Sequence, residues 1–149
     1  MDTLDVAIIG GGPAGLTAAS TLARQLHTAV VFDSGTYRNA GSSHMHMILT
    51  WDHKDPAEYK KAARENILSN YETIQFADVA VTSIKQSDGL FTVTDNTDKV
   101  WSFRKVILAV GSTDTFPDVE GYEELWGKRM YVMIGPEDSL HACVLLTFP

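Results

Sequence analysis

Three glycines near the start of the chain have the spacing of a phosphate-binding turn. Gly10, Gly12 and Gly15 form the pattern G-x-G-x-x-G within the run GGGPAG. In such a turn the first glycine permits a tight bend, the second lets a phosphate approach the backbone, and the third lets the following helix lie close to the strand. Free N–H groups at the start of that helix attract an anion. The run therefore predicts a turn that holds the pyrophosphate of a dinucleotide.

An acidic residue stands where this chemistry needs a partner for a ribose. Asp33 directly follows the apolar run Ala29–Phe32. A carboxylate at the end of the second strand accepts hydrogen bonds from ribose hydroxyls, and its charge disfavours a 2′-phosphate. Strand, glycine turn, helix and acid occur in the order that the motif demands, so we favour dinucleotide binding over a glycine-rich turn that binds nothing. These residues do not distinguish FAD from NAD.

The elements that position these residues follow from the hydrophobic pattern. Asp5–Ile9 and Ala29–Phe32 are rich in β-branched residues, which is typical of strands buried on both faces. Between them, residues 13–27 carry apolar side chains at helical spacing. The three segments predict a βαβ unit, whose right-handed crossover makes the two strands parallel.

The remaining segments are expected to extend the same sheet. Residues 34–54 have no steady period and predict a long loop, which inside a compact domain is usually functional or mobile. Asp55-Pro56-Ala57-Glu58 predicts the start of a helix that continues to about Asn70. Further strands are expected at residues 74–77, 79–86, 90–94, 100–103 and 105–110, and the last of these is expected to be fully buried. We therefore expect a single α/β domain over residues 1–149, Rossmann-like, with a parallel sheet and a small antiparallel β-meander.

Histidines in the long loop are candidates for acid–base chemistry. His44, His46 and His53 lie there together with Asp52, and imidazole titrates near neutral pH. The spacing His-x-His also occurs in metal sites. However, no further cysteine or carboxylate cluster completes a ligand set, so we expect no metal and keep these four residues as catalytic candidates.

Composition excludes several classes of partner. The net charge of −7 argues against nucleic acid and against an anionic membrane. The longest apolar runs have the length of strands, so no membrane span is expected. The acidic opening Met1–Asp5 is unlike a secretory signal and favours the cytoplasm. Cys143 is the single cysteine, so neither an internal disulfide nor a Cys-x-x-Cys pair can form.

Three segments carry a more specific pattern. They are VVFDSGTYRN (30–39), HMHMILTWDHKDPAEYKKAAR (44–64) and KVILAVGSTDTFPDVEGYEELWGK (105–128). Together they resemble the FAD domain of thioredoxin-reductase-like flavoproteins, and within these the fungal branch that includes the gliotoxin-type dithiol oxidases. The resemblance covers roughly residues 4–128, and it implies that the dinucleotide is FAD.

The resemblance also implies which residues line the cofactor. They extend from the glycine turn to the end of the last buried strand: Gly12, Pro13 and Ala14 at the pyrophosphate, Asp33 at the ribose, Ser34, Arg38 and Asn39 along the phosphate–ribityl path, His44, Met45 and His46 toward the flavin, Val81 against the adenine, and Ala109, Val110 and Gly111 close beneath the cofactor.

The chain departs from this family at its end. Relatives insert an NADPH domain after a segment like Gly127-Lys128 and begin it with a Cys-x-x-Cys pair, whereas this chain has no such pair and ends at Pro149. We expect residues 129–149 to form a strand, a turn and a short helix over 139–148 that replace the third FAD motif, with Asp138 near the ribityl–pyrophosphate region. The alternative is a tail that only covers an exposed sheet edge.

Three classes of function remain open. The first is a FAD-binding oxidoreductase that acts on a small molecule, in fungal secondary metabolism, without the disulfide relay or the NADPH domain of its relatives. The second is a redox-inactive isomerase, cyclase or dehydratase that uses the loop histidines for acid–base chemistry. The third is a non-catalytic fragment or binding module. Dimeric relatives and the missing domain also lead us to expect a homodimer.

Overall fold

The computed structural model describes residues 3–126, 130–133 and 143–146. The chain divides into two compact units. The first, called here the sheet unit, consists of Met1–Tyr37 and Ala57–Ser112. The second, called the loop unit, consists of Arg38–Pro56 and Thr113–Pro149.

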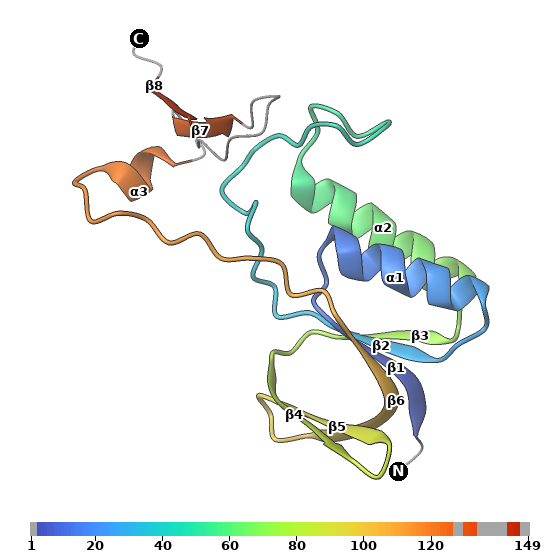
Figure 1. Ribbon diagram of the computed structural model, residues 1–149. Helices are drawn as coiled ribbons and strands as arrows, with labels where there is room; N and C mark the ends of the chain where they lie inside the picture. Colours follow the sequence, from blue (N-terminus) through green and yellow to red (C-terminus); the bar gives the residue numbers. More distant parts are fainter. Residues whose placement is uncertain (1–2, 127–129, 134–142, 147–149) are drawn as a thin grey trace. The chain divides into compact units, whose positions relative to one another are not determined.

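The sheet unit contains a six-stranded sheet in the order β3-β2-β1-β6-β5-β4 (Figure 1). β1 pairs in parallel with β2 and with β6, and β2 pairs in parallel with β3. β5 pairs antiparallel with β4 and with β6. The predicted fold class, a parallel α/β sheet with a small antiparallel meander, is therefore confirmed. The strands span Leu4–Ile9 (β1), Ala29–Phe32 (β2), Ile74–Ala77 (β3), Val81–Ser87 (β4), Leu90–Asp95 (β5) and Val100–Leu108 (β6).

Two helices, α1 (Pro13–Arg24) and α2 (Pro56–Asn70), lie side by side next to β1, β2 and β3 (Figure 1). Alternation along the strands separates two cores, because successive side chains point to opposite faces. Val6 and Ile8 of β1 join a cluster with both helices, whereas Ala7 and Ile9 join a second cluster with the meander. β1 is thus buried on both faces, as its β-branched run predicts.

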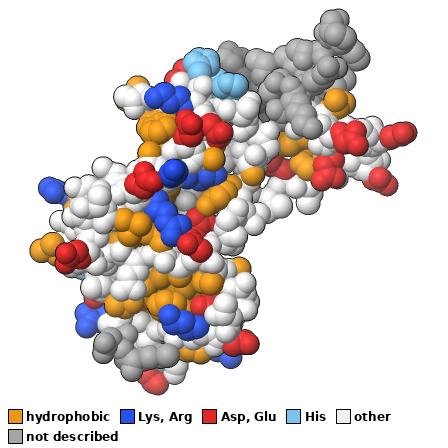
Figure 2. All heavy atoms as spheres, turned by 180° about the vertical axis from the view of Figure 1, so that it is seen from behind, with side chains coloured by type: hydrophobic (Ala, Val, Ile, Leu, Met, Phe, Trp, Pro, Cys, Tyr) orange, Lys and Arg blue, Asp and Glu red, His pale blue; other side chains and the backbone are white. Residues whose placement is uncertain are grey.

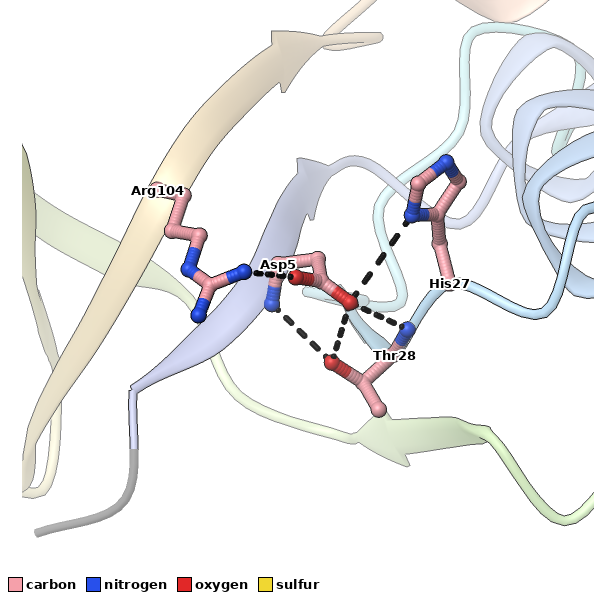
Figure 3. Close-up of polar contacts among 4 residues, drawn as sticks. All are labelled: Asp5, His27, Thr28 and Arg104. Atoms are coloured by element: carbon pink, nitrogen blue, oxygen red, sulfur yellow. Dashed lines mark hydrogen bonds and ion pairs between the residues drawn. The ribbon is translucent and has the colours of Figure 1, made fainter.

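A polar cluster at the start of β1 joins this strand to β6 and to the segment that leads into β2 (Figure 3). The Asp5 carboxylate accepts hydrogen bonds from the N–H and the hydroxyl of Thr28, both at 2.9 Å, and pairs with Arg104 of β6 at 3.1 Å. His27 lies 3.8 Å from the same carboxylate. The Thr28 hydrogen bonds, and then the charges of Arg104 and His27, lower the pKa of Asp5. This cluster fixes the end of the sheet opposite the glycine turn.

A buried carboxylate, Asp95, holds the turn between β5 and β6. Asp95 is only 1% exposed and accepts hydrogen bonds from the N–H and hydroxyl of Thr97, from the N–H of Lys99 and from the indole N–H of Trp101. These donors lower the pKa of Asp95 to about 2. The buried charge is therefore satisfied by its own turn.

Two sequence-based predictions about strands are wrong. The segments 100–103 and 105–110, expected as separate strands, form the single strand β6, because Phe103 pairs with Leu4 on one side and with Phe91 on the other. The expected strand 105–110 is also not fully buried: Leu108, the last residue of β6, and Val110, two residues beyond it, are 69% and 68% exposed. At the junction of the two expected segments, Arg104 and Lys105 lie exposed within a continuous ladder.

The loop unit contains the short helix α3 (Tyr122–Leu125) and an antiparallel pair of strands, β7 (Met130–Met133) and β8 (Cys143–Leu146). The helix expected over 139–148 is therefore wrong, since residues 143–146 form a strand. A short apolar run does not distinguish a strand from a helix by its period. Asp138 lies outside the described residues. In the part of the chain that the structure describes, no helix is long and apolar enough to cross a membrane.

Candidate functional site: a dinucleotide cradle at the strand ends

The candidate site lies where three parallel strands of the sheet unit end. Gly10, Asp33 and Ala109 directly follow β1, β2 and β6. Their N–H groups continue the ladder, donating to the carbonyls of Phe32 (2.9 Å), Ala77 (2.9 Å) and Ile9 (2.8 Å), respectively. The carboxyl ends of parallel strands are where open α/β sheets bind ligands.

Two of the glycines are required by the packing of the protein itself. Gly10 has φ +116°, a conformation that side chains disfavour, and a Cβ there would overlap the carbonyl oxygen of Ala109. Gly15 is buried in α1, and a Cβ there would overlap the carbonyl oxygen of Gly10. Helix α1 therefore begins in direct backbone contact with the end of β1, as the motif predicts.

Gly12 differs from the other two because it faces open space. It is the N-cap of α1 with φ −74° and ψ −177°, a backbone that any residue adopts. Among the described residues, no atom lies within 4 Å of a Cβ built there, and no side chain caps the helix. The first turn of a helix leaves N–H groups without intrahelical partners. The residues at the start of α1 therefore fit an anion such as a pyrophosphate.

Gly11 is a requirement that the sequence pattern did not reveal. It occupies a variable position of G-x-G-x-x-G, yet a Cβ there would overlap the carboxylate of Asp33. The Asp33 side chain thus lies directly against the glycine turn. The run of three consecutive glycines was the only signal in the sequence for this contact.

The Asp33 carboxylate is held in place by its own loop. It is 9% exposed; Oδ1 accepts a hydrogen bond from the N–H of Gly35 at 2.9 Å, and Oδ2 accepts one from the hydroxyl of Tyr37 at 2.5 Å. Burial and this hydrogen bond raise the pKa of Tyr37. The Lys60 ammonium of α2 lies 3.3 Å from the centre of the Tyr37 ring. Sequence reasoning missed Tyr37, which lies four residues after Asp33 in the irregular segment that follows β2.

These contacts leave capacity for a ribose. A carboxylate offers about four lone-pair sites, and Gly35 and Tyr37 use two of those on Asp33. The remaining sites could accept two hydroxyls, so the observed geometry fits the role that the sequence predicts for Asp33. Together with the uncapped start of α1, this makes the site suitable for an adenosine diphosphate.

The other predicted cofactor residues are distributed over both units. In the sheet unit, the structure leaves Pro13, Ala14, Ser34 and Gly111 exposed, and Val81 and Ala109 partly buried. In the loop unit, the Nε of Arg38 donates to both carboxylate oxygens of Asp114, each at 3.0 Å, which raises the pKa of Arg38. Asn39 is partly buried, and its carbonyl accepts the N–H of Ser42. Ligand contacts at these positions stay predictions.

The histidine loop (residues 45–54) brings three of the four catalytic candidates together. His46 Nδ1 lies 3.4 Å from one Asp52 oxygen, and His53 Nε2 lies 3.3 Å from the other. The N–H of Met47 also donates to Asp52, and this hydrogen bond is the largest of the effects that lower its pKa. His44 lies apart from this cluster and bonds the hydroxyl of Ser43 at 2.8 Å. The spacing His-x-His therefore did not indicate which histidines meet.

Comparisons with known proteins agree with this geometry. The profile of the family described as "Pyridine nucleotide-disulphide oxidoreductase" matches residues 4–133. Thioredoxin reductase sirT of Leptosphaeria maculans is 45% identical over 129 residues, which are 85% of this chain and 39% of that protein. Thioredoxin reductase aclD of Aspergillus oryzae is 49% identical, again over 85% of this chain and 41% of its own length. The chain thus spans about two fifths of these curated relatives.

Solved structures give the same result. An oxidoreductase from Agrobacterium tumefaciens superimposes with a TM-score of 0.82 at 38% identity, covering 86% of this chain and 43% of that one. A putative thioredoxin reductase, TrxB, from Bacillus anthracis superimposes with a TM-score of 0.81 at 32% identity, covering 85% and 42% of the two chains. The family profile covers residues 4–133, which include the glycine turn and Asp33.

Proposed function

The chain belongs to the pyridine nucleotide-disulphide oxidoreductase family, whose thioredoxin-reductase-like members bind FAD, and from this premise we propose that residues 1–149 form the FAD-binding part of an oxidoreductase that acts on a small molecule. The observation that carries the proposal is the pairing of the uncapped start of α1 at Gly12 with the Asp33 carboxylate at the neighbouring strand end.

The residues of the sheet unit would bind and orient the cofactor. The N–H groups of the first turn of α1 would receive the pyrophosphate, and Asp33 would accept the ribose hydroxyls. Gly35 and Tyr37 would keep the Asp33 carboxylate turned toward the ribose. FAD, when bound, supplies the redox chemistry, while the protein supplies orientation and electrostatics.

The substrate class rests on the sequence resemblance. The runs D-S-G-x-Y-R-N and H-M-H…T-W-D-H-K-D-P are similar to those of the gliotoxin-type branch, which supports a small secondary metabolite as substrate. No Cys-x-x-Cys pair occurs within residues 1–149, where Cys143 is the single cysteine. Redox work done by these residues alone would therefore use direct transfer between substrate and flavin, or an external reductant.

The visible absorbance of the purified protein, recorded before and after denaturation, tests the cofactor. We expect a flavin spectrum and release of about one FAD per chain, and bleaching of the bound flavin when a dithiol substrate is added without oxygen. A colourless protein that also fails to bind added FAD would overturn the proposal. Turnover that survives removal of FAD would instead favour acid–base chemistry by the loop histidines.

We further propose that the protein is a homodimer in the cytoplasm, by analogy with its relatives. Light scattering at micromolar concentration measures its mass directly. A value near the chain mass of 16.4 kDa would contradict the dimer.

A further inference from the structure

The histidine loop is closed by main-chain hydrogen bonds at its base. The N–H of His53 donates to the carbonyl of Met45 at 2.8 Å, and the N–H of Met45 donates to the carbonyl of Lys54 at 2.8 Å. The Met45 side chain is buried and anchors this closure. Because His46 and His53 flank the base from its two sides, their rings meet with centroids 4.7 Å apart.

Three donor atoms converge beside this closure. His46 Nδ1 lies 3.4 Å from Asp52 Oδ1, and His53 Nε2 lies 3.3 Å from Asp52 Oδ2. One donor atom from each of these three residues can be chosen so that all lie within 4.8 Å of one another. The Met47 N–H, 3.1 Å from Asp52 Oδ1, fixes the orientation of the carboxylate.

The two histidine–aspartate distances are similar to the distance between neighbouring ligands in a tetrahedral metal site. Zinc binds imidazole nitrogen and carboxylate oxygen at about 2.0–2.2 Å in tetrahedral sites. Two ligands at that distance and at the tetrahedral angle are about 3.3–3.5 Å apart. Each histidine–aspartate separation has the length expected between two ligands of one Zn²⁺, but the two separations end on different Asp52 oxygens. A shared ion would therefore need a rotation of the carboxylate or contact with both of its oxygens, and a closer approach of the two imidazoles.

We propose that His46, Asp52 and His53 form a binding site for one Zn²⁺-like transition-metal dication. Two imidazoles and one carboxylate suit zinc, cobalt and nickel, whereas calcium and magnesium prefer sets of oxygen ligands. All three side chains are more than half exposed, so water completes the coordination. Histidine side chains are visible at the surface of the face shown in Figure 2. The Met47 N–H acts as the outer partner that orients a metal-bound carboxylate.

All three proposed ligands lie in the loop unit, and none of them belongs to the glycine turn or is Asp33. The proposal departs from the sequence-based expectation of no metal, which rested on the lack of a further ligand beyond the histidines and Asp52. The structure groups Asp52 with His46 and His53, one carboxylate oxygen near each ring.

Calorimetric titration of Zn²⁺ into chelator-treated protein tests the proposal. We expect one Zn²⁺ per chain, and at least a tenfold weaker affinity in His46→Gln and in Asp52→Asn. His53→Asn should have the same effect, and asparagine tolerates the φ of +61° at that position. His44→Gln is the matched control, since His44 is an exposed histidine two residues from His46 that bonds Ser43 instead.

Co²⁺ provides a second measurement on the unchanged protein. Bound Co²⁺ in a site of low coordination number should give visible absorbance that Zn²⁺ abolishes by competition. The proposal is overturned if no Zn²⁺ binds, if His44→Gln weakens binding as much as the ligand variants do, or if Asp52→Asn and His46→Gln both keep the wild-type affinity.

Discussion

Gly12 and Gly15 belong to the same motif, but the structure predicts opposite consequences for replacing them with alanine. A Cβ on Gly15 would overlap the carbonyl oxygen of Gly10, whereas among the described residues nothing lies within 4 Å of a Cβ on Gly12. Gly15 is therefore required by the fold, whereas a bound ligand would explain the glycine at position 12. Gly15→Ala should lower stability, and Gly12→Ala should lower affinity for FAD.

The stability change in Gly15→Ala has two opposing parts. Overpacking against a backbone atom costs up to about 3 kcal/mol. Replacing glycine by alanine inside a helix returns about 1 kcal/mol through higher helix propensity. The free energy of unfolding of the FAD-free protein should therefore fall by about 2 kcal/mol. In Gly12→Ala the weaker N-cap, about 0.5–1 kcal/mol, is offset by about 0.4–1 kcal/mol of lost unfolded-state entropy, so stability should stay almost unchanged.

The affinity change concerns Gly12→Ala. A methyl group at the mouth of the anion site would displace the pyrophosphate from at least one N–H of the first turn of α1. A hydrogen bond to a charged group contributes about 1.5–3 kcal/mol, which corresponds to a Kd raised about 10- to 150-fold.

Two measurements separate the two effects. Urea denaturation of the FAD-free proteins, followed by far-UV circular dichroism, gives the free energies of unfolding. Titration with FAD, followed by the quenching of flavin fluorescence, gives Kd. A folded Gly12→Ala protein with the wild-type Kd would refute the placement of the pyrophosphate, and a Gly15→Ala protein as stable as wild type would refute the packing argument.

Two further substitutions test the carboxylates. Tyr37→Phe removes one hydrogen bond to Asp33 and should lower the free energy of unfolding of the FAD-free protein by about 1 kcal/mol in urea, after allowance for partial exposure; an unchanged midpoint would mean that Tyr37 does not hold the acid. Because the pKa of Asp95 is lowered in the folded protein, Asp95 stabilises the fold fully at pH values above its ordinary pKa of 3.8. This stabilisation is lost as the pH falls toward about 2. Asp95→Asn, whose amide cannot accept every donor that Asp95 does, should have a lower Tm at pH 7, and its Tm should fall less than that of wild type between pH 5 and pH 2; parallel Tm curves would contradict this.

Local chemistry explains why much of the sheet unit could be predicted. β2, β3 and the end of α2 fall where the β-branched runs and the helical period place them. The glycine turn was predictable because its constraints lie within six residues, from the tight bend at Gly10 to the close approach at Gly15. Asp33 was predictable because a strand end fixes its position relative to that turn.

The predictions that failed depend on contacts between distant segments. β6 is continuous because Phe103 pairs with two strands at once, which the exposed Arg104 and Lys105 conceal in the sequence. β8 is a strand because it pairs with β7, a contact that its own apolar run does not encode. The meeting of His46 with His53 depends in the same way on the main-chain closure at Met45.

The glycine motif therefore combines two kinds of information that the sequence alone does not separate. Gly10 and Gly15 are needed for the end of β1 to contact α1, and Gly11 is needed for Asp33 to lie against the turn. Each of these three would be retained by a protein that kept the fold and bound no nucleotide. Among the described residues nothing gives Gly12 a comparable steric reason, because a Cβ there would meet no atom within 4 Å. Gly12 by itself is therefore a stronger argument for a phosphate at this site than the complete G-x-G-x-x-G pattern.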